Sequence, residues 1–324
     1  MRHRLIAIAL PLLATAALAA QGRPRIFVFD HPFWINLHHY LYVLGRVEAK
    51  MPDVARRAVA GAAADQDAGL AALTEQERKV WRESVSAYAT GLSRRDAVFD
   101  DEMVNATAAL IKAGAATPAA SAGIDPAVAA ALDRAAPLYR KAWWTGHEAA
   151  NRKRIDELDR LVGEHGPAIL TFITRAYQEK WPADGYPVRI AAFSNWAGAY
   201  STRGNILVMS SLDEGTRGTL GLEIVFHEAM HQWDDAIDLR LRDAAKRAQV
   251  ARVPDNLTHA MIFYTAGEAT RRAIPGHVPY AELNGMWKQA RMAPFRDALD
   301  RHWKPYLEGR GSLGAALEAL LKAQ

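Results

Sequence analysis

The periodicity of the apolar residues changes once along this chain, and that change limits the folds it can adopt. From about Pro32 to Lys180, apolar residues recur at the three- and four-residue spacing of helices. Two short apolar runs that read as strands follow, at 188–193 and 205–210, and helical spacing returns from Thr219 onward. The order of helices, a small sheet and further helices predicts a mostly helical α+β fold.

Local signals set several helix boundaries. Thr74 and Glu77 form the capping-box pattern that starts a helix, and Asp125 before Pro126 is a second start signal. Apolar spacing predicts helices over 137–162, 168–179, 220–237, 239–250, 256–272, 280–301 and 312–323.

The first twenty residues have the pattern of a signal peptide. A short basic start precedes the apolar stretch 5–16, and Ala17-Leu18-Ala19 supplies a small-x-small cleavage pattern. The apolar run is shorter than the roughly 20 residues that span a bilayer, although an uncleaved membrane anchor is the alternative. We therefore expect export to the periplasm or secretion, with no stable membrane span after cleavage. The predicted organisation is a signal peptide at 1–20, a helical region at 21–182 and a catalytic region at 183–324, the last two able to share one core.

Composition excludes several classes of site and partner. The chain has no cysteine, which excludes disulfides, thiolate metal ligands and cysteine nucleophiles. Lys and Arg number 40 against 36 Asp and Glu, and this near balance argues against a nucleic-acid partner, which would require a concentrated basic face.

One motif carries a specific chemical prediction, the HExxH sequence His227-Glu228-Ala229-Met230-His231. Residues four apart share one face of a helix, so both imidazoles can bind one metal ion. Imidazole without thiolate favours zinc, and Glu228 would accept a proton from water at the metal. The alternative is a surface helix with unrelated histidines, but the apolar residues before His227 favour a buried helix.

Two strands followed by an HExxH helix resemble the zincin metallopeptidases, in a bacterial branch of that superfamily. The resemblance covers roughly 187–272. It implies a zinc-dependent peptidase in which an edge strand beside the active-site helix pairs with the substrate backbone. Residues 195–200 occupy the place where such a strand would fall.

The resemblance also bears on the third metal ligand. A metzincin would have Gly and His where this chain has Asp234 and Ile237, so that pattern is absent. A gluzincin takes a glutamate from a later helix, which implies Glu268. The spacing is longer than in the thermolysin-like enzymes, and Arg272 replaces the aspartate expected four residues further on.

Two alternatives to Glu268 as a ligand remain open. Glu268 could instead pair with Arg271 or Arg272 on the helix surface. His259 is a rival ligand, or a donor at the edge of the cleft. His259 and Glu268 lie half a turn of the helical wheel apart, so both could face one metal only if Gly267 bends the helix.

Several other polar residues are candidates for supporting roles in the site. A gluzincin-like site implies a phenol or imidazole that stabilises the oxyanion, and Tyr264 and Tyr280 are the candidates, with ordinary packing as the alternative. Asp235, one turn after His231, could orient that ligand or lie at a solvated helix end. Glu223 shares a helix face with the motif, where it could support a ligand or be solvated.

These features together predict an exported zinc-dependent hydrolase, a metallopeptidase acting on an unidentified peptide or protein. Zinc held by His227, His231 and Glu268 would lower the pKa of its water towards about 7, and Glu228 would take the proton. The alternative function is a non-catalytic zinc-containing envelope protein that binds peptide or cell-wall fragments. A third possible function is that of a helical interaction protein in which the HExxH sequence occurs by chance.

Overall fold

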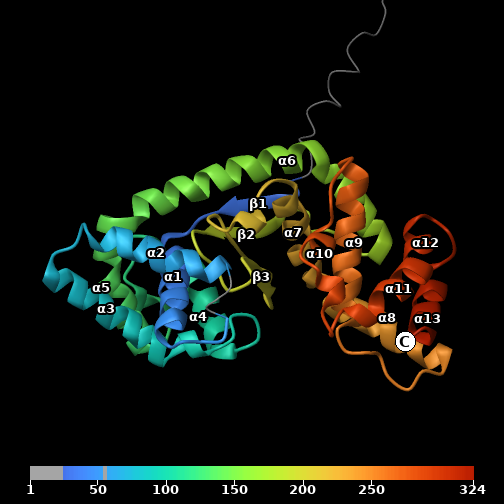
Figure 1. The fold of residues 1–324 in the computed structure, drawn as a ribbon, viewed down its shortest axis with the longest axis horizontal. Helices are drawn as coiled ribbons and strands as arrows, with labels where there is room; N and C mark the ends of the chain where they lie inside the picture. Colours follow the sequence, from blue (N-terminus) through green and yellow to red (C-terminus); the bar gives the residue numbers. More distant parts are fainter. Residues whose placement is uncertain (1–24, 54–56) are drawn as a thin grey trace, which may run out of the picture.

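The computed structural model describes residues 25–53 and 57–324, so the predicted signal peptide lies outside the described residues. Most described residues are helical, and one small mixed sheet lies in the middle of the molecule (Figure 1). The predicted mostly helical α+β class is confirmed at this level.

The sheet has four strands in the order β1-β2-β4-β3. Their bounds are β1 Phe27–Asp30, β2 Tyr186–Ala191, β3 Ala199–Thr202 and β4 Ile206–Ser210. β1, β2 and β4 are parallel, whereas β3 pairs antiparallel with β4 and forms an edge. The sequence predicted β2 and β4. It did not predict β1, whose four residues pair with a strand from the other half of the chain.

The helices before the sheet are α1 Phe33–Glu48, α2 Arg57–Leu70, α3 Glu75–Thr90, α4 Asp101–Lys112, α5 Pro126–Tyr139 and α6 Thr145–Tyr177. Both predicted start signals are confirmed, because Thr74 and Glu77 form the capping box of α3 and the Asp125 side chain caps α5. The predicted break between 162 and 168 is wrong. Pro167 lies inside α6, which continues for 33 residues along the top of the molecule (Figure 1).

The helices after the sheet are α7 Gly218–Met230, α8 Asp234–Ala248, α9 Leu257–Ala273, α10 Tyr280–Leu283, α11 Arg296–Ala298, α12 Lys304–Leu307 and α13 Leu313–Lys322. The predicted helix 220–237 is interrupted, because His231–Trp233 form a 3₁₀ turn between α7 and α8. The predicted helix 280–301 is replaced by short pieces, and Gly285 has a positive φ of 61° between two of them.

The sheet is buried on both faces by two hydrophobic clusters. Leu207 and Met209 of β4 face a cluster built mainly by α6, α7, α8, α9 and α13. Ile206 and Val208 face the opposite way, into a cluster built mainly by α1, α3, α4 and α5. The alternation follows from the two-residue period of a strand. Burial on both faces explains why β4 reads as a continuous apolar run.

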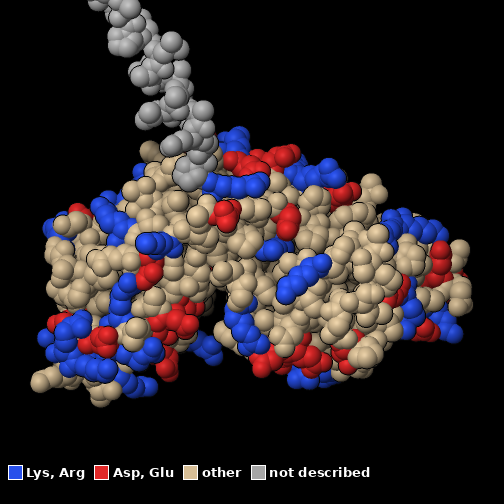
Figure 2. All heavy atoms as spheres, turned by 180° about the vertical axis from the view of Figure 1, so that it is seen from behind, with Lys and Arg blue, Asp and Glu red and all other residues tan. Residues whose placement is uncertain are grey.

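The surface carries charges of both signs. On the face shown in Figure 2, Lys and Arg side chains are interspersed with Asp and Glu, and the lower outline is hollowed between two lobes. In the described part of the chain, no helix combines the length and the hydrophobicity needed to cross a bilayer.

Two histidines of α1 are packed inside the fold. His38 and His39 are fully buried, and the His39 imidazole donates from Nδ1 to the Ile35 carbonyl at 2.8 Å and accepts from the Tyr200 hydroxyl at 2.8 Å. Burial lowers the pKa of His39 from 6.5 to about 4, opposed by the hydrogen bond to Ile35, and lowers the pKa of His38 as well.

This burial predicts acid sensitivity. Below pH 6.5 the unfolded chain takes up a proton at His39 that the folded chain resists until about pH 4, so stability falls as pH drops through that window. The loss from His39 approaches about 3 kcal/mol near pH 4. Urea unfolding at pH 7.5 and pH 5 should show it, and His39→Gln should flatten the dependence. The partly exposed His165 provides the control His165→Gln, and an unchanged slope in His39→Gln would contradict the prediction.

Candidate metal centre

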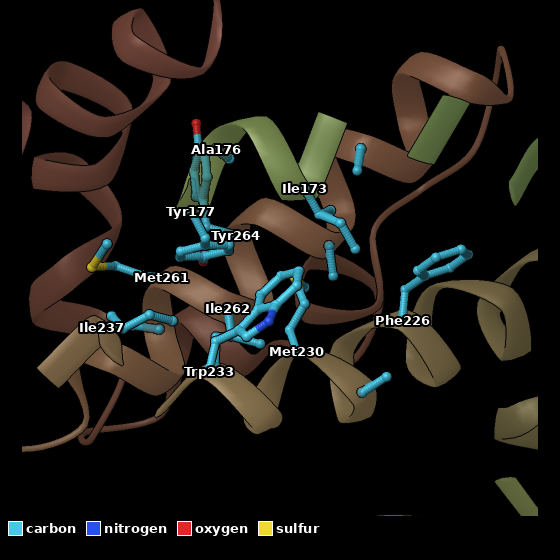
Figure 3. Packing of buried hydrophobic residues seen from close by; sticks show 14 of the residues in the cluster. Ile173, Ala176, Tyr177, Phe226, Met230, Trp233, Ile237, Met261, Ile262 and Tyr264 are labelled. Carbon is cyan, nitrogen blue, oxygen red and sulfur yellow. The ribbon is translucent and has the colours of Figure 1, made fainter. Parts of the chain in front are cut away.

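Packing fixes the orientation of the motif helix. α7 is apolar over most of its length, and its Phe226 and Met230 side chains are fully buried. Figure 3 shows these two residues in the cluster with Trp233, Ile262 of α9 and Tyr177 of α6. Because this face of α7 is held in the core, the motif side chains on its other side have a fixed direction.

Three imidazoles meet where α7 ends beside the start of α9. His227, His231 and His259 each offer a ligand nitrogen, and these atoms lie within 4.8 Å of one another. The Nε2 atoms of His227 and His259 are 3.3 Å apart. Two nitrogens bound at about 2.0–2.1 Å to a tetrahedral zinc would be separated by about 3.4 Å. The spacing therefore fits a shared metal ion.

A carboxylate orients one of these imidazoles. The Nδ1 atom of His231 lies 2.9 and 3.1 Å from the two carboxylate oxygens of Asp234. A carboxylate only accepts, so Nδ1 carries the proton and Nε2 is left free as a metal ligand. The sequence pointed to Asp235, which is instead exposed. The cause is the 3₁₀ turn, which has three residues per turn and brings Asp234 under His231.

The protonation states of His227 and His259 suit ligation. Burial lowers the pKa of His227, and the neighbouring His231 and His259 lower it further. Burial together with His231 lowers the pKa of His259 to about 4. Both imidazoles are therefore neutral at pH 7 and offer lone pairs. Burial also acts to lower the pKa of His231, but the Asp234 hydrogen bond and the Glu228 charge outweigh it and raise that pKa.

The structure places Glu268 outside this group. Its buried carboxylate pairs with the Arg271 guanidinium and lies 3.9 Å from that of Arg272. α9 runs unbroken from 257 to 273, so His259 and Glu268 face opposite ways, as the helical wheel predicts. Gly267 does not bend α9. A Cβ atom there would lie 2.7 Å from Pro279, so the glycine allows the following loop to approach closely.

Glu228 interacts with His231 of the metal centre and with the edge strand. Its side chain is half-buried, and its Oε2 atom accepts a 2.7 Å hydrogen bond from the Ser201 hydroxyl on β3. Burial raises the pKa of Glu228, while the His231 charge and the Ser201 hydrogen bonds oppose that rise. The expected edge segment was 195–200, whereas β3 covers Ala199–Thr202. Sequence reasoning therefore missed Ser201, which lies one residue beyond the expected segment.

The two tyrosines proposed for the oxyanion have different surroundings. The Tyr264 hydroxyl donates to Asp300 at 2.5 Å, and burial raises its pKa. Tyr280 stacks on Phe263 at 6.2 Å between ring centroids. The Phe263 ring in turn lies 3.9 Å from the His227 ring. Tyr280 is thus linked to the His227 ring through Phe263, whereas the Tyr264 ring packs against Trp287.

Glu223 is packed inside the fold and is not solvated. It is buried one turn before His227, and its carboxylate is 2.6 Å from Nε2 of His277 and accepts from the Tyr280 backbone N–H. These bonds attach the loop after α9 to α7, close to the aromatic residues beside the centre.

The Asp234 contact yields a test of the metal centre. Asp234→Ala removes the carboxylate that orients His231, and loss of such a partner lowers metal affinity about 10- to 100-fold. Competition for zinc against a chromophoric chelator measures this change. The neighbouring variant Asp235→Ala removes an exposed carboxylate and should bind zinc as the wild type does. Equal affinities in the two variants would contradict the assignment.

Comparisons with known protein families, curated proteins and solved structures find no match for this chain. The geometry of the site itself is therefore what bears on function. It brings together three imidazoles and, next to one of them, a carboxylate that is hydrogen-bonded to the edge strand of the sheet.

Proposed function

We propose that this protein is an exported zinc-dependent hydrolase, and specifically a metallopeptidase. The observation that carries the proposal is the convergence of His227, His231 and His259 beside Glu228. A purely structural zinc site has four protein ligands, whereas three leave a position open for catalysis. The signal-peptide pattern of residues 1–20 supports export.

The donor set favours zinc among the common metals. Three imidazoles without thiolate suit zinc, and no cysteine is present in the chain to provide another type of site. The observed nitrogen spacing of 3.3 Å agrees with this choice. Zinc in such a site supplies Lewis-acid activation of water and of a carbonyl group.

The chain's own residues supply the proton transfers. Glu228 follows the first ligand directly, and its carboxylate stands next to the ligand His231. In the proposed reaction Glu228 accepts the proton of the attacking water and then donates it to the leaving amine. The three histidines hold the metal, and Asp234 keeps His231 in the tautomer that leaves Nε2 free.

The edge strand favours a peptide as the substrate. β3 is paired on one side only, by β4, and its Ser201 contacts Glu228. An extended peptide can add to a free strand edge through main-chain hydrogen bonds, which would carry its carbonyl groups past the carboxylate. The zincin resemblance of the motif supports the same reading.

Metal analysis and a peptide digest test the proposal together. The purified chain should contain one equivalent of zinc and should cleave a peptide library, with activity removed by a chelator and restored by zinc. A chain that retains no stoichiometric metal after exposure to zinc is not a hydrolase of this type. Stoichiometric zinc without cleavage of any peptide would instead support the zinc-containing binding protein.

A further inference from the structure

Ser201, on the edge strand β3, donates a side-chain hydrogen bond to the proposed base Glu228. It is buried at 8% exposure, and its hydroxyl lies 2.7 Å from Oε2 of Glu228. The two residues come from different elements, β3 and α7. The bond therefore ties the sheet edge to the metal-binding helix at the point where the reaction is proposed to occur.

The position of the hydroxyl is fixed by the sheet. Ser201 pairs in register with Leu207 of the central strand β4, which is buried on both faces. The next residue, Thr202, donates its hydroxyl to the Val98 carbonyl and so anchors the end of β3 to the N-terminal helical region. Ser201 consequently acts as a fixed donor, in contrast to a side chain on a mobile loop.

The carboxylate needs such a donor. A glutamate side chain on a helix has several rotatable bonds, and the Glu228 carboxylate lies within range of the His231 charge. A hydrogen bond to an ionised carboxylate is short and strong, and it holds one oxygen in a single place. A displacement of about 1 Å in a reacting group can cost about 100-fold in rate.

We propose that Ser201 is a positioning residue that holds the Glu228 carboxylate in the orientation required for proton transfer. The role depends on the proposed hydrolase function. The Ser201 hydroxyl acts through Glu228, and its replacement leaves the β3 main chain in place for substrate, so loss of the hydroxyl should lower kcat and leave KM and zinc content nearly unchanged.

Variants of Ser201 and of a serine elsewhere in the fold test the role, with the library peptide that the wild type cleaves fastest as the probe. Ser201→Ala should lower kcat about 10- to 100-fold. Ser201→Thr keeps the hydroxyl, suits a strand and should restore most of the rate. Ser86→Ala removes a matched serine–glutamate hydrogen bond, between α3 and Glu48 of α1, without touching β3 or Glu228, and should keep a kcat near that of the wild type.

A double-mutant cycle separates positioning from general damage. In a Glu228→Gln background, Ser201→Ala should change the residual single-turnover rate by no more than about twofold, since the base that it positions is absent. An equal loss in both backgrounds, or an unchanged kcat in Ser201→Ala, overturns the role of Ser201. A zinc-loaded wild type that cleaves no peptide overturns the proposed function and this role with it, so the two failures are distinguishable.

Discussion

Glu228→Gln is expected to bind zinc as the wild type does and to lose about 10²- to 10⁴-fold in kcat, the range that a general base contributes. Glutamine keeps the length of the side chain and can still accept from the Ser201 hydroxyl. It cannot take a proton from water at neutral pH. The metal ligands are untouched, so zinc content and catalysis should separate in this variant.

Zinc analysis and initial rates on the same preparation measure that separation. Glu164→Gln is a suitable control, because it removes an exposed carboxylate of α6 that pairs with Arg160 one turn away on the same helix. Full activity in Glu228→Gln with zinc bound would exclude Glu228 as the base. Loss of zinc in that variant would mean instead that the carboxylate helps to hold the metal.

Periodicity and capping predicted the elements that carry the centre. The α7 and α9 segments were predicted because each has a long apolar pattern, and β2 and β4 because each is a short apolar run between turn residues. β1 was missed because its four residues are stabilised by pairing with β2 from the other half of the chain. Such a non-local contact leaves no signal in a short local window.

The finer details of the centre depended on packing that a sequence pattern does not contain. Asp234, and not the predicted Asp235, orients His231, because the helix tightens into a 3₁₀ turn at His231. The contact between Ser201 and Glu228 depended on where β3 begins and ends and on the register of β3 with β4. The choice between His259 and Glu268 depended on which face of α9 turns towards α7. The helical wheel could show that only one of them would face the motif, but it could not show which.

His259→Ala is expected to lose stoichiometric zinc, whereas Glu268→Gln is expected to keep it. His259 is one of only three imidazoles in the centre, so its loss should exceed the 10- to 100-fold effect typical of an outer partner such as Asp234. Glu268 lies on the other face of α9, and its arginine partners are partly exposed. Replacing that carboxylate with an amide leaves two guanidinium groups that water can reach, so the variant should remain folded.

Metal analysis after dialysis, with circular dichroism to confirm folding, distinguishes the two variants. His259 is half-buried and stacks on Phe263 at 4.7 Å between ring centroids, so truncation to alanine leaves most of the core intact. His165→Ala on α6 controls for loss of a histidine in general.

The opposite pattern, with zinc kept in His259→Ala and lost in Glu268→Gln, would require α9 to turn by half a revolution about its axis. That rotation would move Ile262 and Met261 out of the hydrophobic cluster that they share with α7, and it would move the glycine at 267 away from Pro279. The third metal ligand and the packing of α9 are thus one structural choice, and zinc retention reports on both.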